Sequence, residues 1–255
     1  MVLGCARQAS FGTSGEVDLA KNCVDVGLFT TRLEEMRLFY GERIGLKFEE
    51  VLSLGAGSHQ HRFALRGSVL KINHGPGALG PRGVGGYRRL VIADSRYSTP
   101  TELADPDGNL LELRPPGTGD VNQIEIVLAV TDEDAFERFY GDALGGVRIA
   151  PRRFRIGQSV ISFAHDHDVR KVAHGGSDSP TEAVAALRAI GFRYLTIQVR
   201  DCNWEHHRLM RMGVTQGSAP VTLGEVARIS FIRDPDGNWI ELSQRASLTG
   251  ALPKD

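Results

Sequence analysis

Cysteine is scarce in this chain, and its three copies, Cys5, Cys23 and Cys202, lie far apart. An odd number of cysteines without any Cys-x-x-Cys pair indicates neither a zinc knuckle nor a disulfide framework. Each thiol is expected to be an inert small side chain rather than a nucleophile. A reducing compartment suits this composition, and the cytoplasm is the expected location.

Long apolar runs and an excess of charge of one sign are also missing. No stretch approaches the roughly 18 apolar residues that a membrane span needs. The net charge of −1 provides no basic surface for nucleic acid or for an anionic membrane. The first 22 residues lack the basic start and apolar centre of a secretory signal and are expected to form a loose tail. The expected partner is therefore a small molecule.

What the chain does contain is a repeated turn. The pentapeptide Asp-Pro-Asp-Gly-Asn occurs at Asp105–Asn109 and again at Asp234–Asn238, each time followed by two large apolar residues, a glutamate and a leucine. Asp-Gly and Gly-Asn favour the positive φ of a tight turn. Side chains alternate along the strand that follows, so Glu112 and Glu241 face away from their apolar neighbours. The chain is therefore predicted to be a duplication.

A second motif repeats with the first. Phe39-Tyr40-Gly41 recurs as Phe139-Tyr140-Gly141, each at the end of a segment with helical spacing. Apolar strand patterns lie before and after both segments. Each half of the chain thus opens with a strand, a helix and three further strands, which predicts an α+β fold.

The two halves are not equally complete. Glu112 follows Arg89 by 23 residues, whereas Glu241 follows Tyr194 by 47. A helical crossover between parallel strands needs a dozen residues or more, and the first half is too short for a second one. The first half is therefore predicted to be truncated.

Paired βαβββ modules with these two motifs resemble the vicinal oxygen chelate superfamily, which includes glyoxalase I, bleomycin-resistance proteins and extradiol dioxygenases. The resemblance implies tandem paired modules that form two cupped mixed sheets. It divides the chain into an N-terminal tail (1–22), a degenerate glyoxalase-like domain (23–117), a complete glyoxalase-like domain with the ligand site (122–246) and a C-terminal tail (247–255).

Members of this superfamily often hold a divalent metal ion through two histidines and the glutamate after the final turn. In the second half, Glu241 occupies the glutamate position, Glu125 replaces the first histidine and Tyr194 replaces the second. The resemblance thus implies Glu241 and Glu125 as metal ligands or bases, with Tyr194 as an orienting group or acid. Carboxylate and phenol oxygens suit a hard ion better than iron or zinc. An alternative is that Tyr194 fills the metal position and hydrogen-bonds to Glu241 or Glu125.

Further side chains are expected near this site. Ser162 stands at the position of an additional glutamate in glyoxalase-type sites. His165 follows on the same strand, and Trp239 lies just before Glu241. These three residues are predicted to contact the ligand.

The corresponding positions of the first half are Asp25, Lys71, Arg89 and Glu112. Ammonium and guanidinium groups have no lone pair for a metal ion. We therefore expect no metal there, but a charge-compensated cluster or a small site for a carboxylate or phosphate.

Three functions remain open from the sequence. The first is a small-molecule enzyme of the isomerase, lyase or ring-cleavage type that uses the C-terminal cup, with or without a divalent metal ion. The second is a metal-free protein that binds or sequesters a small molecule, as bleomycin-resistance proteins do. The third is a scaffold whose cups are both filled. A monomer or a homodimer is compatible with all three.

Overall fold

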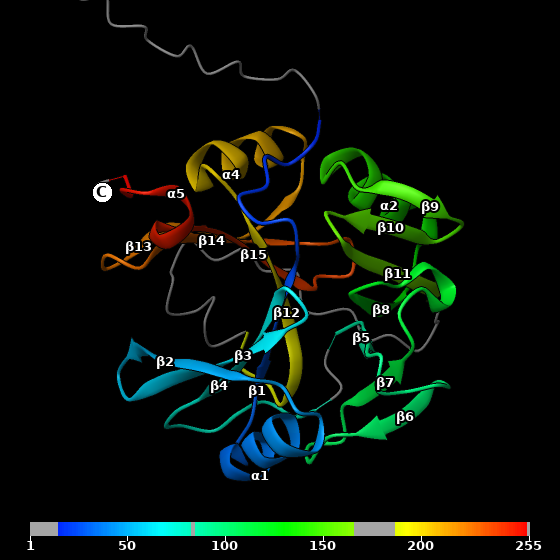
Figure 1. Ribbon diagram of the computed structural model, residues 1–255. Coiled ribbons are helices and arrows are strands. Elements are labelled where there is room, and N and C mark those ends of the chain that lie inside the picture. Colours follow the sequence, from blue (N-terminus) through cyan, green and yellow to red (C-terminus); the bar gives the residue numbers. More distant parts are fainter. Residues whose placement is uncertain (1–14, 83–84, 166–186, 254–255) are drawn as a thin grey trace, which may run out of the picture.

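The computed structural model describes residues 15–82, 85–165 and 187–253. These residues form two mixed β-sheets, with short helices on the outside (Figure 1). The eight-stranded sheet runs in the order β13 (Thr215–Leu223), β14 (Ala227–Arg233), β15 (Trp239–Arg245), β12 (Gly191–Gln198), β1 (Asp25–Phe29), β4 (Ser68–His74), β3 (Ser58–Leu65) and β2 (Phe48–Gly55). The seven-stranded sheet runs β6 (Thr101–Ala104), β7 (Leu110–Arg114), β5 (Tyr87–Ala93), β8 (Ile124–Val130), β11 (Ser159–His165), β10 (Arg153–Ile156) and β9 (Val147–Ala150).

The helices are short and follow the module plan. They are α1 (Leu33–Leu38), η1 (Phe39–Arg43), η2 (Thr118–Asp120), α2 (Glu133–Glu137), η3 (Arg138–Ala143), α4 (Cys202–Arg211) and α5 (Ala246–Thr249). Asp201 caps α4, since its carboxylate accepts a hydrogen bond of 2.9 Å from the backbone N–H of Trp204. Within the described residues, no helix combines the length and the apolar character needed to cross a membrane.

The predicted α+β fold with two mixed sheets of paired modules is confirmed. The predicted truncation is also visible, because β5 is followed directly by β6 without a helix between them. The second module therefore contributes only the three strands β5, β6 and β7 to its sheet.

The pairing of modules differs from the expectation that each half of the chain builds its own cup. In the eight-stranded sheet β1 pairs with β12, so the first module joins the fourth. In the seven-stranded sheet β5 pairs with β8, so the second module joins the third. The first strands of all modules have similar apolar patterns, and each has an unpaired edge until two modules come together. Local sequence therefore permits either arrangement.

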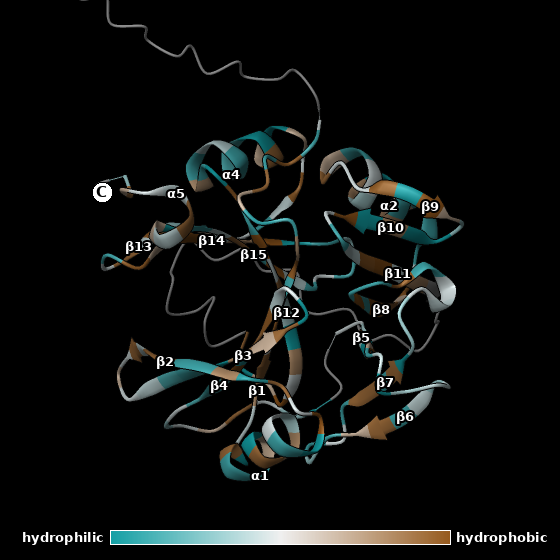
Figure 2. Ribbon diagram, in the orientation of Figure 1, coloured by the Kyte–Doolittle hydropathy of each residue, from teal (hydrophilic) through white to brown (hydrophobic). Residues whose placement is uncertain are grey.

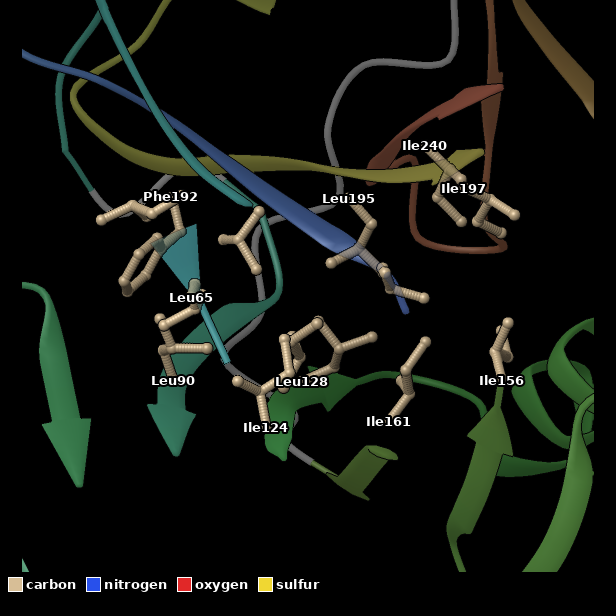
Figure 3. Close-up of a cluster of buried hydrophobic side chains, with 14 of the residues drawn as sticks. Leu65, Leu90, Ile124, Leu128, Ile156, Ile161, Phe192, Leu195, Ile197 and Ile240 are labelled. Carbon is tan, nitrogen blue, oxygen red and sulfur yellow. The ribbon is translucent and has the colours of Figure 1, made fainter. Parts of the chain in front are cut away.

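The largest cluster of buried hydrophobic side chains among the described residues lies between the two sheets. Leu195 and Ile240 of the eight-stranded sheet lie opposite Leu128 and Ile161 of the seven-stranded sheet (Figure 3). Apolar colour follows these strands, whereas α1 and α4 carry much of the hydrophilic colour on the outside (Figure 2). Strand alternation directs the intervening side chains to the opposite faces, away from this shared core. Each sheet thus has an outer face on which a ligand site can form.

The repeated motifs bind each other across the two sheets. The Tyr40 hydroxyl donates a buried hydrogen bond of 2.8 Å to Asp105, and the Tyr140 hydroxyl donates one of 3.2 Å to Asp234. Each aspartate also accepts backbone N–H groups of its own turn. The Phe-Tyr and Asp-Pro-Asp-Gly-Asn motifs are therefore one structural unit, used twice.

Candidate functional site

A cavity of about 810 Å³ lies on the outer face of the eight-stranded sheet. We call this cavity the eight-stranded cup. Its floor comes from the central strands β1, β4, β12 and β15, and its walls come from β2, β3, β13 and β14. Apolar residues that line the cavity include Phe29, Ile229 and Phe231. Polar side chains lie at the floor, where alternation directs every second residue of each strand into the cavity.

A buried ion pair occupies the floor. The Lys71 Nζ atom lies 2.6 Å from Glu241 Oε2 and 2.7 Å from Thr196 Oγ1. The Thr196 hydroxyl also donates to Glu241 Oε2, at 2.6 Å. Burial lowers the pKa of Lys71, and the neighbouring carboxylates of Glu241 and Asp25 oppose this shift. No described residue hydrogen-bonds to the second oxygen, Oε1, of Glu241, so that oxygen remains available to a ligand.

Asp25 begins β1 beside this pair. Its carboxylate accepts hydrogen bonds from the Val69 backbone N–H at 2.8 Å and from the Gln198 side chain at 3.1 Å. Lys21 also pairs with it, at 2.6 Å. Asp25 is therefore held by a full set of donors and is not a free ligand group.

Tyr194 covers the other side of the floor. Its phenol oxygen accepts hydrogen bonds from the amides of Asn73 at 3.0 Å and Gln60 at 3.3 Å. Burial is the main cause that raises its pKa, followed by the charge of Glu241, so the hydroxyl stays protonated. The hydroxyl proton is used in neither of these hydrogen bonds, so among the described residues this hydroxyl is a donor without an acceptor.

Arginines at one wall of the cup are bridged by a glutamate. Arg62 Nε lies 3.1 Å and Arg245 Nη2 lies 2.7 Å from Glu50 Oε1. Arg62 also donates to Gln60, at 3.0 Å, which links this wall to the phenol of Tyr194. The wall is therefore ordered by charge pairs rather than by apolar packing alone.

The residues at the superfamily's metal positions do not fit a divalent ion. In the eight-stranded cup these positions hold Asp25, Lys71, Tyr194 and Glu241. An ammonium group occupies the centre of the set and pairs with Glu241, and the phenol is protonated. Among the described residues, no three histidine, cysteine, aspartate or glutamate side chains converge as a metal site.

Glu125 is not part of this cup, which corrects its predicted grouping with Tyr194 and Glu241. It lies on β8 in the seven-stranded sheet, where Arg153 Nε is 3.2 Å from Oε1 and Arg114 Nη1 is 3.7 Å from Oε2. Glu125 and Glu241 therefore cannot coordinate one metal ion. The alternative in which Tyr194 hydrogen-bonds to Glu241 or Glu125 is also not the observed arrangement.

The three predicted ligand contacts are divided between the sheets. Ser162 and His165 lie on β11 of the seven-stranded sheet, away from Glu241. Trp239 lies on β15 next to Tyr194, but it is buried against Phe231 and does not line the cavity. Of the predicted site residues, the structure brings Tyr194 and Glu241 together in one cup and places Glu125, Ser162 and His165 in the other sheet.

Several residues of the floor were missed. Gln60, Asn73 and Thr196 all hydrogen-bond to Tyr194, Lys71 or Glu241. Asn73 lies two residues after Lys71, so strand alternation puts both on one face. That signal becomes useful only when β4 and β12 are known to belong to the same sheet.

Comparison with known proteins supports the fold. Residues 122–242 match the Glyoxalase family, described as the Glyoxalase/Bleomycin resistance protein/Dioxygenase superfamily. Glyoxalase I of Zea mays is 16% identical with a TM-score of 0.63, over 87% of this chain and 92% of that one. The cppA protein of Streptococcus pneumoniae is 10% identical with a TM-score of 0.50, over 90% of this chain and 100% of that one. No curated protein matches the chain.

Proposed function

Because the chain belongs to the glyoxalase/bleomycin resistance protein/dioxygenase superfamily, we propose that it binds a small organic molecule in the eight-stranded cup, and that it does so without a metal ion. The observation that carries the proposal is the Lys71–Glu241 pair of 2.6 Å at the metal position. The ammonium neutralises the carboxylate that would otherwise attract a divalent ion. The volume of about 810 Å³ suits a drug-sized ligand.

The lining defines the chemical class of the ligand. Phe29 and Phe231 provide aromatic surface, so the ligand has an apolar or aromatic body. The Tyr194 hydroxyl offers a donor, and Glu241 Oε1 offers an acceptor. The ligand therefore carries an oxygen that accepts a hydrogen bond and a hydroxyl, amide or ammonium group that donates one.

Metal analysis and ligand screening test this proposal. We expect the purified protein to lack stoichiometric metal and its thermal stability to be unaffected by a chelator. We also expect aromatic ligands with a donor and an acceptor to raise the melting temperature. Tyr194→Phe should lower the affinity for such a ligand roughly tenfold, because it removes a hydrogen bond of about 1.4 kcal/mol. A stoichiometric divalent ion that is lost in Glu241→Gln would contradict the proposal.

Catalysis of the isomerase, lyase or ring-cleavage type is the second candidate. The observation that favours a proton-abstraction step is the asymmetry of Glu241, whose Oε2 is held by two donors while Oε1 is open. In such a step Glu241 would take the proton through Oε1, and the ammonium of Lys71 would stabilise the negative charge that develops nearby. Hydrogen–deuterium exchange of carbonyl compounds, followed by NMR, tests it. Exchange that persists in Glu241→Gln would rule out this role.

A further inference from the structure

A second cavity, of about 480 Å³, lies on the outer face of the seven-stranded sheet. We call this cavity the seven-stranded cup. Its charged lining differs from that of the eight-stranded cup, because arginine outnumbers glutamate. The charged residues that line it are Arg88, Arg89, Arg114, Arg153, Glu112 and Glu125. Three of the arginines, Arg89, Arg114 and Arg153, contact the two glutamates, and these contacts decide what the cup can bind.

The two carboxylates of the cup are already satisfied by these arginines. Glu112 Oε1 lies 2.6 Å from Arg114 Nη2, and Glu112 Oε2 lies 2.8 Å from Arg89 Nη1. Glu125 Oε1 lies 3.2 Å from Arg153 Nε. Both glutamate side chains are 7% exposed, so each is a buried anion that is paired within the cup.

Donor capacity remains after this pairing. Arg153 uses Nε on Glu125 and Nη2 on the carbonyl oxygen of Gly119, at 2.6 Å. No described residue pairs with its Nη1. Arg114 Nη1 lies 3.7 Å from Glu125 Oε2, too far for a hydrogen bond. Arg114 and Arg153 thus flank the carboxylate of Glu125, one at each oxygen, and both keep N–H groups that no described acceptor uses.

The charge of the lining is positive. Four arginines line the cup against Glu112 and Glu125, and Arg89, Arg114 and Arg153, which contact these glutamates, already carry three charges that do not titrate against two. Arg89 also contacts Glu102, at 2.8 Å, but that glutamate side chain is 69% exposed and solvent screens its charge. The cup therefore favours a negatively charged ligand.

The uncharged lining is apolar. Val91 and Val127 form part of the floor, and Leu110 lies at the edge with 45% of its surface exposed. Inorganic phosphate would leave this surface in contact with water. An organic acid would cover it with an apolar body while its carboxylate accepts paired N–H donors from arginine.

We propose that the seven-stranded cup is a second ligand site, which binds a small apolar monocarboxylate between Arg114 and Arg153. The site shares no residue with the eight-stranded cup and does not depend on the function proposed there. The seven-stranded cup is thus an anion site rather than an inert remnant of the fold.

Titration calorimetry on the full chain at low salt tests the proposal with benzoate as the probe, and benzamide and inorganic phosphate as comparisons. We expect benzoate to bind at least tenfold more tightly than benzamide or phosphate, and we expect its affinity to fall as salt is added. Arg153→Gln should lower the affinity for benzoate at least tenfold. Arg148→Gln is the matched control, since Arg148 pairs with Glu137 at 2.8 Å outside the cup, and it should change nothing.

Equal affinity for benzoate and benzamide would overturn the proposal, and so would phosphate binding as tightly as benzoate. An Arg153→Gln protein that folds and binds benzoate normally would also overturn it. If Arg153→Gln fails to fold, Arg114→Gln takes its place, and the comparison of probes on the unmodified chain decides independently of any variant.

Discussion

The ring of Tyr194 lies directly over Gly27 on the neighbouring strand. A Cβ atom built on Gly27 would lie 2.1 Å from two carbons of that ring. Gly27 and Tyr194 are paired across the β1–β12 contact. The absence of a side chain on Gly27 therefore lets the phenol lie across the floor of the eight-stranded cup and reach Asn73.

Replacing Gly27 by alanine should displace this ring. The phenol would lose its contacts with Asn73 and Gln60, and we expect a loss of about 1–3 kcal/mol in the free energy of unfolding, as for other overpacked sites. Urea denaturation measures it. Gly41→Ala is the control, because its nearest contact would be an ordinary 3.4 Å. A Gly27→Ala protein as stable as the control would show that the ring does not need this space.

Breaking the ion pair of the cup should cost more. Lys71→Met leaves Glu241 buried beside Thr196 alone, and we expect a loss of about 3–5 kcal/mol. Replacing both Lys71 and Glu241 by methionine should restore much of the lost free energy of unfolding, since no unpaired charge remains. Lys47→Met at an exposed position should stay within about 0.5 kcal/mol of the unmodified chain. A double variant less stable than Lys71→Met would contradict this account.

The exchanged pairing of modules predicts that the halves depend on each other. Fragments 1–120 and 121–255 each contain one module from each of the two sheets. Each fragment alone therefore lacks the β1–β12 and β5–β8 contacts. We expect neither fragment to show a cooperative thermal transition by circular dichroism, and an equimolar mixture to recover one. Cooperative unfolding of the isolated 121–255 fragment would indicate that its two modules pair with each other.

Stability should fall in acid through Asp94. Its hydrogen bonds with Arg96, aided by Arg66, lower its pKa to about 2 in the folded protein, below its ordinary value of about 3.9. The carboxylate therefore stabilises the fold above about pH 4, and this contribution is lost as the pH falls through about 2. Asp94→Asn should reduce the pH dependence of urea unfolding in this range. Asp18→Asn, at an exposed pair, should leave that dependence intact.

Cys202 should resist alkylation in the native protein. Burial raises its pKa to about 12, and its thiol lies 3.5 Å from the Ser230 hydroxyl. The reactive thiolate is therefore nearly absent at mildly alkaline pH. Peptide mass spectrometry after iodoacetamide treatment should find Cys202 unmodified in buffer and modified in concentrated urea. Rapid labelling of the folded protein would show that α4 opens readily.

Local sequence determined much of this protein. The Asp-Pro-Asp-Gly-Asn turns predicted where Glu112 and Glu241 enter their strands, because turn chemistry and strand alternation are short-range properties. The spacing after Arg89 predicted the truncated second module. The resemblance to the superfamily also grouped Tyr194 with Glu241, and both line the same cup.

Only the tertiary structure decided which modules share a sheet. The first strands present equivalent edges, so the repeat could not show that Lys71 of the first module would meet Glu241 of the fourth, or that Glu125 would lie among arginines of the other sheet. These contacts join residues far apart in the sequence, and they depend on the long-range pairing of β1 with β12 and β5 with β8. The chemistry of both cups follows from that pairing, because it determines which charges neutralise each other.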